Sequence, residues 1–536
     1  NKNNEAITVE VNKSHDFLMF PSIDSVWALR KKILADKRFN ILKERDSSFS
    51  DGHHEMELIL GDTASTRGIL IKNVVKGGLL YEVKTTIDTT VERSRFVKEF
   101  YQNFKPFDTI IGKGILTDKA PAFFSALRNN DSILIDGYRF IQFHEKHIDS
   151  LKYYISEFDF PPDKKNIQSH LIQKMGKIDS PEVMPFFQEF YASSYNNSHA
   201  QTKILQAVSN NRDQASTKIM LDLMAKDIPL VSNKFEIHSI FKNFKDSLPL
   251  AKQLYPELLD YSAVEEYKSP IFSMLAQLVA ESLVKPKTYK KYRKQMLNDA
   301  KIQLKRQLGI SNYRNLNRNQ NNNTRNNGRE LLEDYAILLY PFIHEKEVKL
   351  FFERLLLVKD EKLRTTYAAL LAKDGIPLPV GMLDSLSADI NSRNLLFNKF
   401  KKIHKLDLLP SGYRTEKSIA EALLFEFKNY DQRRHTVIFL EQRRLQYEDK
   451  TYTGYYFKTR DKQDYDKNYK MHLVVFKNGK ILSTLPYYKN DGLRIEDTES
   501  DAEVLEYVTE EFLLKDRPRA VVYRPNGYGA YGFQGY

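Results

Sequence analysis

Residues 165–225 read KNIQSHLIQKMGKIDSPEVMPFFQEFYASSYNNSHAQTKILQAVSNNRDQASTKIMLDLMA, and their apolar residues recur with the period of an α-helix. Polar breaks of two to five residues divide this stretch into short segments. Asp179 or Ser180, and Asp213, stand where N-caps belong, and Pro181 suits a first helical turn. The helices predicted on this pattern are Lys165–Met175, Pro181–Tyr195, Ala200–Asn210 and Ala215–Ala225. Repeated helix–turn–helix units of this length are typical of an α-solenoid of the HEAT type.

An internal match supports a repeat. LMAKDIPL at Leu223–Leu230 resembles LAKDGIPL at Leu371–Leu378, and each copy follows an amphipathic segment and contains a proline that stops a helix. The helical period continues to about Phe427, with a break at Asn312–Asn327, where a run of asparagines favours a flexible loop. We therefore predict a mainly α fold, a HEAT-like α-solenoid of helix pairs flanked by an α+β domain at each end.

The two ends of the chain mix helix and strand signals. Near the start, two helices, Asp24–Phe39 and Glu92–Phe104, enclose an antiparallel meander with strands at Glu55–Leu60, Arg67–Val75 and Leu79–Thr86. From about Asp431 we predict strands at Val437–Leu440, Gly454–Thr459 and Lys470–Phe476, a hairpin turn at Asn478-Gly479, a returning strand at Ile481–Pro486, a helix at Ala502–Leu514 and a last strand at Arg519–Tyr523.

The domains expected from these signals are an N-terminal α+β domain at 1–160, a first helical-repeat segment at 161–311, an Asn-rich loop at 312–329, a second helical-repeat segment at 330–430, a small C-terminal α+β domain at 431–524 and a Gly/Tyr tail at 525–536.

Composition excludes several classes of chemistry. The 536 residues include no cysteine, which excludes disulfides, thiolate metal sites and cysteine nucleophiles and favours an exported protein. The net charge of +12 is spread along the chain, as expected of a solvated surface. The longest apolar stretch, Ile271–Val284, is too short and too polar to span a bilayer, so we predict a buried helix there. Because the chain begins at Asn1 without a methionine, we expect a processed protein or part of a longer product.

The histidine clusters are the catalytic candidates. His144, Glu145 and His147 resemble the zinc-protease helix motif, but that motif needs its histidines four residues apart, and these are three apart. They could form a metal site only if other ligands arrive from distant segments. His53 and His54 are adjacent, so in a strand they point to opposite faces and cannot easily share one metal. Gly112-Lys113-Gly114 lacks the longer frame of a phosphate loop. We predict no metal and no cofactor.

Two segments are partner-binding candidates. In the basic helix predicted at Lys285–Leu308, side chains could contact phosphates while tyrosines stack on bases. An apolar stripe on the same helix, at Leu297, Ile302, Leu304 and Leu308, favours a surface helix of the solenoid instead. In the Gly/Tyr tail, tyrosines offer a large contact area to a partner, and a disordered tail without a partner is the alternative. The candidates are Tyr289, Lys290, Lys291, Tyr292, Arg293 and Lys294 in the helix and Tyr528, Tyr531, Phe533 and Tyr536 in the tail.

The order of these pieces resembles a known family. The matching motifs are GGLLYEV at 77–83, SRF at 94–96, FKPF at 104–107, the helix pairs, and FLLKDRPRA at 512–520. They resemble the carboxyl-terminal half of long bacterial envelope proteins whose amino-terminal half is a TraB/GumN domain. The resemblance implies an exported, envelope-associated protein. In that family the metallohydrolase-like chemistry belongs to the TraB/GumN domain, marked by Gly-x-x-His and Gly-x-x-Gly elements and a glutamate, and we find no equivalent here.

Three functions stay open from the sequence. The preferred one is a non-enzymatic scaffold, a protein–protein interaction subunit of a bacterial cell-envelope complex in the periplasm or at the outer membrane. The alternative is a hydrolase or metal-dependent enzyme of TraB/GumN type, with a site near the N-terminal domain. The third is a nucleic-acid binder that uses the basic helix. The expected partners are other envelope proteins, with no transmembrane segment in the chain itself, and a lipid anchor upstream of Asn1 stays open.

Overall fold

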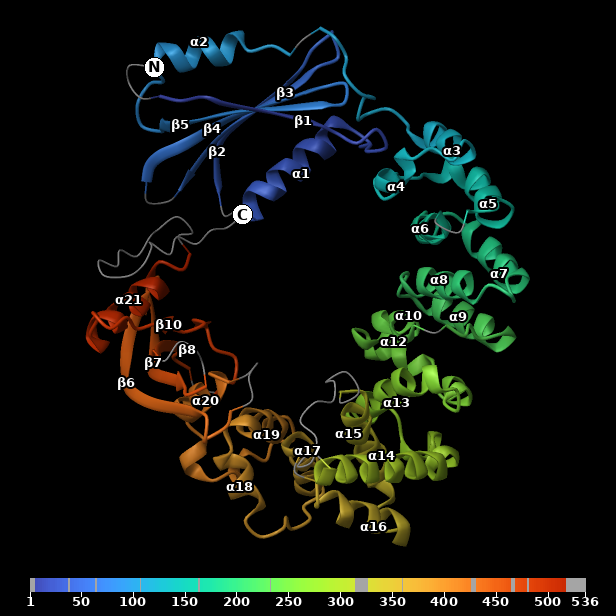
Figure 1. Ribbon diagram of the computed structural model, residues 1–536, viewed down its shortest axis with the longest axis vertical. Coiled ribbons are helices and arrows are strands. Elements are labelled where there is room, and N and C mark those ends of the chain that lie inside the picture. The colour runs from blue at the N-terminus through green and yellow to red at the C-terminus, as the bar shows by residue number, and fades with distance from the viewer. Residues whose placement is uncertain are drawn as a thin grey trace. The chain divides into compact units, whose positions relative to one another are not determined.

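The computed structural model contains helices and two antiparallel sheets, so the chain is mixed α and β with substantial helical content (Figure 1). It divides into two units, Asn1–Asp246 and Ser247–Tyr536, called unit 1 and unit 2 below. The residues described are 5–36, 39–62, 65–106, 108–161, 164–231, 233–313, 326–358, 360–425, 430–463, 468–479 and 482–516.

Unit 1 begins with a five-stranded antiparallel sheet in the order β1-β5-β4-β3-β2. The predicted meander is confirmed as β3, β4 and β5, and Gly77 adopts a φ of 58° at the β4–β5 turn, which glycine tolerates. The two edge strands, β1 and β2, were not predicted, because neither has a buried face that would leave a strong alternating pattern. The strands are β1 Thr8–Lys13, β2 Asn40–Ser48, β3 His54–Asp62, β4 Ser65–Lys76 and β5 Leu79–Asp88.

Two helices, α1 and α2, cover opposite faces of this sheet (Figure 1). Alternation along β3 explains the two layers: Met56, Leu58 and Leu60 are buried on the α1 side with Trp27, whereas Ile59 is buried on the α2 side. Both helices were predicted, with longer bounds. Their bounds are α1 Ile23–Asp36 and α2 Arg95–Asn103.

The rest of unit 1 is helical. The four helices predicted between residues 165 and 225 are confirmed as α6 to α9, and Asp213 caps α9 by accepting a hydrogen bond from the Ser216 N–H at 2.7 Å. The prediction that Asp179 or Ser180 caps α7 is wrong, because the chain makes one more turn and α7 starts after Glu182. The elements are α3 Ala120–Arg128, α4 Ile133–Gly137, η1 Glu145–His147, α5 Ile148–Ser156, α6 Lys165–Met175, α7 Val183–Ser193, α8 Ser198–Ser209, α9 Gln214–Lys226, α10 Lys234–Ile240 and α11 Lys242–Lys245.

Helices close in sequence pack on one another in two rows. In unit 1, α5 contacts α7 and α7 contacts α9, while α6 contacts α8 and α8 contacts α10 (Figure 1). Contacts of α5 with α6, of α7 with α8 and of α8 with α9 join the rows. Each of these helices therefore packs on the next helix, the next but one, or both.

Unit 2 repeats this order of contacts. Helices α13, α15, α17 and α19 contact one another in succession, α14 contacts α15 and α16, and α18 contacts α17 and α19. The predicted buried helix at Ile271–Val284 is confirmed as far as Ala280, where α13 ends, and most of the asparagine run lies outside the described residues. The elements are α12 Leu248–Gln253, η3 Glu257–Tyr261, α13 Glu265–Ala280, η4 Pro286–Thr288, η5 Lys290–Tyr292, α14 Arg293–Tyr313, α15 Asn326–Leu339, η7 Tyr340–Phe342, α16 Lys346–Leu355, α17 Glu361–Lys373, α18 Met382–Ala388, α19 Ile390–Lys402, η8 Leu406–Leu408, η9 Ser411–Tyr413 and α20 Glu416–Leu423.

The two copies of the internal match occupy equivalent places. Leu223–Leu230 contains the end of α9, and Leu371–Leu378 contains the end of α17. In both copies the lysine before the aspartate is the last helical residue, and the proline follows three positions later in the first copy and four positions later in the second. The match therefore marks the same local event, the end of a helix, in each unit.

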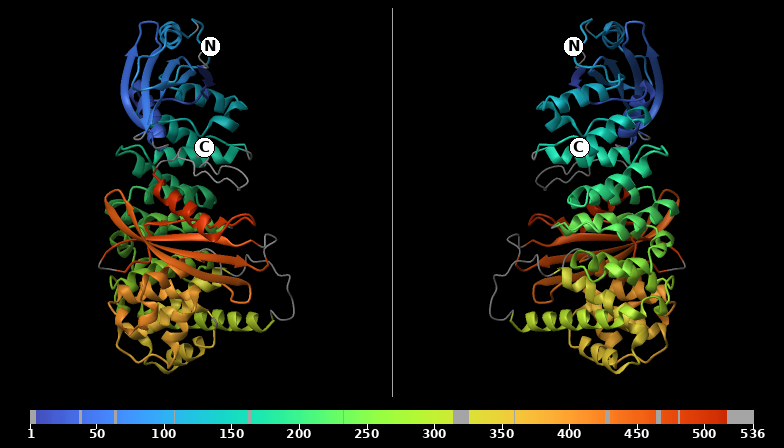
Figure 2. Two further views of the ribbon diagram at one scale, coloured as in Figure 1. Left: turned by 90° about the vertical axis from the view of Figure 1, so that its left-hand side faces the viewer. Right: turned by 90° about the vertical axis from the view of Figure 1, so that its right-hand side faces the viewer.

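A second antiparallel sheet lies near the end of unit 2, in the order β10-β8-β7-β6, with β9 also paired to β8. Helix α21, which was predicted at Ala502–Leu514, packs on it through Val504, Val508 and Phe512 (Figure 2). The predicted returning strand at Ile481–Pro486 is wrong over its described residues, 482–486, which form no strand. The strand that returns along β8 is β9, and it begins later, at Tyr488. The predicted strand at Arg519–Tyr523 lies outside the described residues. The elements are β6 His435–Tyr447, β7 Lys450–Asp461, β8 Lys470–Lys477, β9 Tyr488–Lys489, β10 Leu493–Arg494 and α21 Asp501–Leu513.

Within the described part of the chain, no helix has the length and apolar character needed to cross a membrane.

The core between α1 and the first sheet provides a direct test. Leu58 is fully buried there beside Trp27, the only tryptophan of the chain, so tryptophan fluorescence reports on this core. We expect Leu58→Ala to lower the free energy of unfolding by about 2–5 kcal/mol, through lost burial and the cavity left behind. Urea titration followed by fluorescence measures this. Leu29→Ala, at a position of α1 that is 45% exposed, is the matched control and should change it by less than about 0.5 kcal/mol. Equal effects would contradict the assignment of the core.

Candidate functional site

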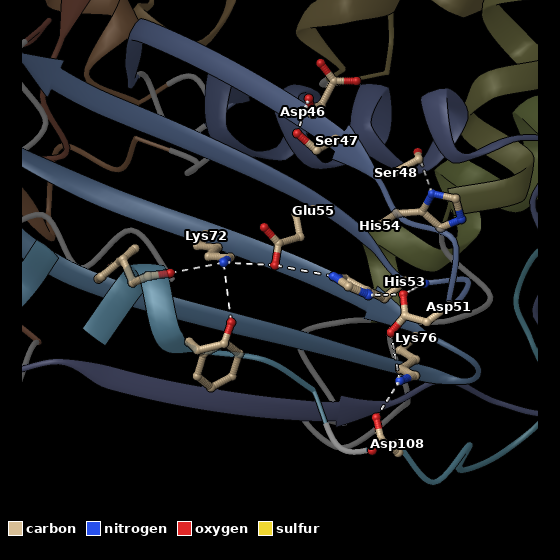
Figure 3. A network of polar contacts seen from close by, with 12 residues as sticks. Asp46, Ser47, Ser48, Asp51, His53, His54, Glu55, Lys72, Lys76 and Asp108 are labelled. Atoms are coloured by element: carbon tan, nitrogen blue, oxygen red, sulfur yellow. Dashed lines mark hydrogen bonds and ion pairs between the residues drawn. The ribbon is translucent and has the colours of Figure 1, made fainter. Parts of the chain in front are cut away.

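The most extensive network of polar contacts around the histidine candidates lies where β2 turns into β3 (Figure 3). His53 is buried, and its ring stacks on Phe49 with 4.1 Å between the ring centroids. Its Nδ1 contacts Asp51 Oδ1, and its Nε2 lies 3.7 Å from Glu55 Oε1. Each ring nitrogen therefore faces a carboxylate of this same hairpin.

Two buried lysines of β4 complete the network. Lys72 Nζ lies 2.9 Å from Glu55 Oε1 and donates to the carbonyl oxygens of Tyr101 and Phe104 at 3.1 and 3.4 Å. These carbonyls are at the end of α2, where a cation is favourable. Lys76 Nζ lies 3.2 Å from Asp51 Oδ2. The network thus ties the β2–β3 turn, β4 and the end of α2 together.

The electrostatics favour a structural role for this network. Burial raises the pKa of Asp51, but hydrogen bonds from His53 and Lys76 outweigh it and lower the pKa to about 2. A general base needs a ring nitrogen that can take a proton from a substrate, and both nitrogens of His53 already face carboxylates. The arrangement pairs buried charges and fixes the turn. His54 points away from His53 and contacts Ser48 Oγ at 2.8 Å, which agrees with the expected opposite faces (Figure 3).

The second histidine candidate is also a paired buried group. His147 Nε2 donates to Asp118 Oδ2 at 2.9 Å, and its Nδ1 accepts from the His144 backbone N–H at 3.0 Å, so both ring nitrogens are in use. His144 and Glu145 are exposed. Among the described residues, no group of three or more His, Asp or Glu side chains is arranged to hold a metal ion. The three residues proposed as catalytic candidates are not brought together into one site.

Asp118 is the partner that sequence analysis missed. Burial raises the pKa of this carboxyl, but hydrogen bonds from Lys146, the Ala120 backbone N–H and His147 lower it well below its usual range. Asp118 stands just before α3, and His147 stands 29 residues later. Nothing in the sequence marks the two as a pair, since α3 and α4 lie between them and only the packing of this region brings them together.

The basic segment is not the single surface helix that we predicted. It consists of two 3₁₀ turns, η4 and η5, followed by α14. Tyr289 is fully buried with its ring edge-on to Phe342, so it is unavailable for stacking on a ligand, which corrects the prediction. Tyr292 donates to Asp260, and Arg293 pairs with Glu345.

The other residues of this segment divide between surface and core. Lys290, Lys291 and Lys294 are exposed, and Lys291 Nζ lies 3.4 Å from Asp260 Oδ1. Of the predicted apolar stripe, Leu297 and Leu304 are buried and Leu308 is half-buried. Ile302 is exposed, because the buried face of α14 runs through Met296 and Ala300 instead. The tail candidates Tyr528, Tyr531, Phe533 and Tyr536 lie outside the described residues.

The buried lysines were the missed signal in the sequence. Lys72 and Lys76 are four residues apart in a strand, on one face, within a stretch of β4 in which most other residues are apolar. A lysine in such a run needs a partner when buried. The alternation could have pointed to a buried ion-pair network, but it could not have named Asp51 or Glu55 as the partners.

Comparison with known proteins adds no identification. No family model matches the chain, and no curated protein matches it. Among solved structures, one titled "Lipid-protein interactions in lipovitellin" is similar at 10% identity and a TM-score of 0.20, over 93% of this chain and 57% of that one. The chain thus spans little more than half the length of that protein. A likeness at this level supports no conclusion about fold or function, and the resemblance to TraB/GumN-type envelope proteins stays a prediction.

The low pKa of Asp51 predicts an effect of acid. Because its folded-state pKa of about 2 lies below the value near 3.9 of an unfolded aspartate, the carboxylate stabilises the fold above about pH 4. This contribution is lost as the pH falls from about 4 toward 2. Asp51→Asn should therefore be less stable than the wild type at neutral pH and lose less stability in that window.

Urea unfolding followed by Trp27 fluorescence at several pH values measures this difference. Asp108→Asn is the matched control, since its exposed carboxylate lies 3.8 Å from the same Lys76. An Asp51→Asn profile that parallels the wild type throughout would contradict the role of the network.

The two histidines of the 144–147 segment should behave differently. His147→Phe keeps a ring but removes both hydrogen bonds, so we expect it to destabilise the region around α3 and η1 by about 1–3 kcal/mol. His144→Ala, at an exposed position, should have little effect. Hydrogen exchange of peptides covering residues 118–148, read by mass spectrometry, distinguishes the two variants. Equal protection in both would refute the structural assignment of His147.

Proposed function

We propose that this protein is a non-enzymatic scaffold, a protein-interaction subunit of a bacterial cell-envelope complex. We further propose that the helices of each unit form a HEAT-like α-solenoid, with the α+β regions at the two ends of the chain closing or docking it. The envelope location, in the periplasm or at the outer membrane, rests on the resemblance of the sequence motifs to the TraB/GumN-type proteins.

The order of contacts between helices carries this proposal. In both units a helix packs on the next helix, the next but one, or both, and in unit 1 these contacts form two rows. Solenoids are built in this way, because each repeat contacts its neighbours and leaves an extended surface for partners. The histidine pairs do not favour the enzyme alternative, since their ring nitrogens already face carboxylates or a backbone N–H.

Unit 1 also presents apolar side chains at successive turns. Tyr195, Leu230 and Phe235 are 76%, 59% and 84% exposed. The Leu230 N–H donates to Ser198 Oγ at 3.2 Å, which joins the α7–α8 turn to the connection between α9 and α10. Tyr195 and Leu230 therefore lie at the same ends of two consecutive helix pairs, and Phe235 follows in the first turn of α10. Large exposed apolar groups at such an edge suit an apolar segment of a partner protein.

The test is recovery of partners from native cells. We expect the tagged wild-type chain, extracted in mild detergent, to retain a stoichiometric set of envelope proteins that mass spectrometry identifies. A triple variant, Tyr195→Ser, Leu230→Ser and Phe235→Ser, should lose at least one of them by tenfold or more, because the apolar contact is gone.

The matched control is a second triple variant with equally exposed apolar residues of unit 2, Leu357→Ser, Val380→Ser and Leu485→Ser. If both variants retain the same amounts of every partner protein, the surface of Tyr195, Leu230 and Phe235 is not the contact. A wild-type chain that purifies alone would count against the scaffold function itself.

A further inference from the structure

The side chain of Lys515 is enclosed by aromatic rings at the end of α21. Its Nζ lies 3.1 Å from the ring centroid of Tyr447, 4.8 Å from that of Tyr487 and 5.0 Å from that of Phe512. These rings come from the end of β6, from the residue before β9 and from α21. Three separate elements thus converge on one ammonium group, and only 13% of the lysine side chain is exposed.

A carboxylate completes the enclosure. Asp516 Oδ2 accepts a hydrogen bond from Lys515 Nζ at 2.8 Å and another from the Tyr447 hydroxyl at 2.5 Å. The second bond fixes the Tyr447 ring against the ammonium. Negative charge beside ring faces is the combination that attracts an organic cation.

The rings are held from behind by the core. Tyr452 is buried, lies 4.5 Å from the Tyr487 ring and 5.9 Å from the Phe512 ring, and Phe512 is itself fully buried. Tyr487 contacts Phe512 at 6.3 Å. The cluster is therefore preorganised by packing that does not depend on Lys515, and it would keep its form without the ammonium.

We propose that Tyr447, Tyr487 and Phe512, together with Asp516, form an aromatic cage for an organic cation, that Lys515 occupies it in the free chain, and that a quaternary ammonium group is its preferred ligand. A lysine ammonium is strongly hydrated and gives up water to enter the cage. A quaternary ammonium has no N–H groups to desolvate and gains the same attraction from the rings, which is how aromatic cages select such cations. Lys515 then acts as an internal competitor.

Binding of tetramethylammonium to the full chain tests the cage, measured by isothermal titration calorimetry and saturation-transfer NMR. We expect Lys515→Ala to bind tetramethylammonium at least tenfold more tightly than the wild type, because the competitor is gone. Lys477→Ala, at an exposed lysine of the same sheet, should show no gain. Adding Tyr487→Leu, at a ring that is 43% exposed, to Lys515→Ala should abolish the gain without opening the core. No gain in Lys515→Ala, or a gain that survives Tyr487→Leu, would overturn the proposal.

A second measurement covers the case in which Lys515→Ala does not fold. The chain has no cysteine, so Lys515→Cys can be alkylated at one position only. Alkylation with (2-bromoethyl)trimethylammonium places a quaternary ammonium in the cage, and iodoacetamide gives a neutral control. The charged adduct should unfold at a higher temperature than the neutral one in the wild-type cage, and the two should converge when Tyr487→Leu is added. Equal unfolding temperatures of the charged and the neutral adduct, with Tyr487 present, would refute the proposed cage.

Discussion

The helices of this protein depend on burying their apolar stripes against helices that follow closely in sequence. Helices of 11–13 residues such as α6 to α9 are only marginally stable alone in water. Leu171 of α6, Tyr191 of α7 and Leu205 of α8 are fully buried, and each large apolar side chain contributes about 1.5–3 kcal/mol on burial. Since the covering helix is the next one or the next but one, local sequence order sets the order of packing. The two sheets meet the same requirement differently, because α1, α2 and α21 cover their faces.

A second constraint concerns charge inside these layers. Lys72 and His53 are buried in the first sheet, and His147 is buried beside α3. A buried polar or charged group without a partner is costly, so each of the three contacts a carboxylate, and the pairs connect segments that the chain alone would leave apart. This explains why residue types typical of active sites serve here to fix turns and helix ends. Their ring nitrogens and ammonium groups contact intramolecular partners, and the surfaces that we propose for binding another molecule lie elsewhere, at the exposed apolar residues of unit 1 and around Lys515.

Prediction from sequence succeeded where the signal was local. The bounds of α6 agree with the predicted helix, Asp213 caps α9, and the meander of β3 to β5 follows from alternation along each strand. It failed where exposure removes the pattern, as for the edge strands β1 and β2. It also failed where a polar-looking residue is buried by distant segments: Tyr289 looks like part of a basic surface helix, yet it packs edge-on against Phe342, 53 positions later. No local property of residues 285–294 reveals that contact.

The sequence by itself determined the helical periods, the cap of α9, the two strand-rich ends and the absence of cysteine chemistry, because these depend on residues within a few positions of one another. Only the tertiary structure decided which charged and aromatic side chains meet. Asp51 with Lys76, Asp118 with His147 and Tyr447 with Lys515 are each separated by at least 25 residues. Pairing over such distances depends on how the elements pack, and packing selects by shape and burial, which no short segment of sequence encodes.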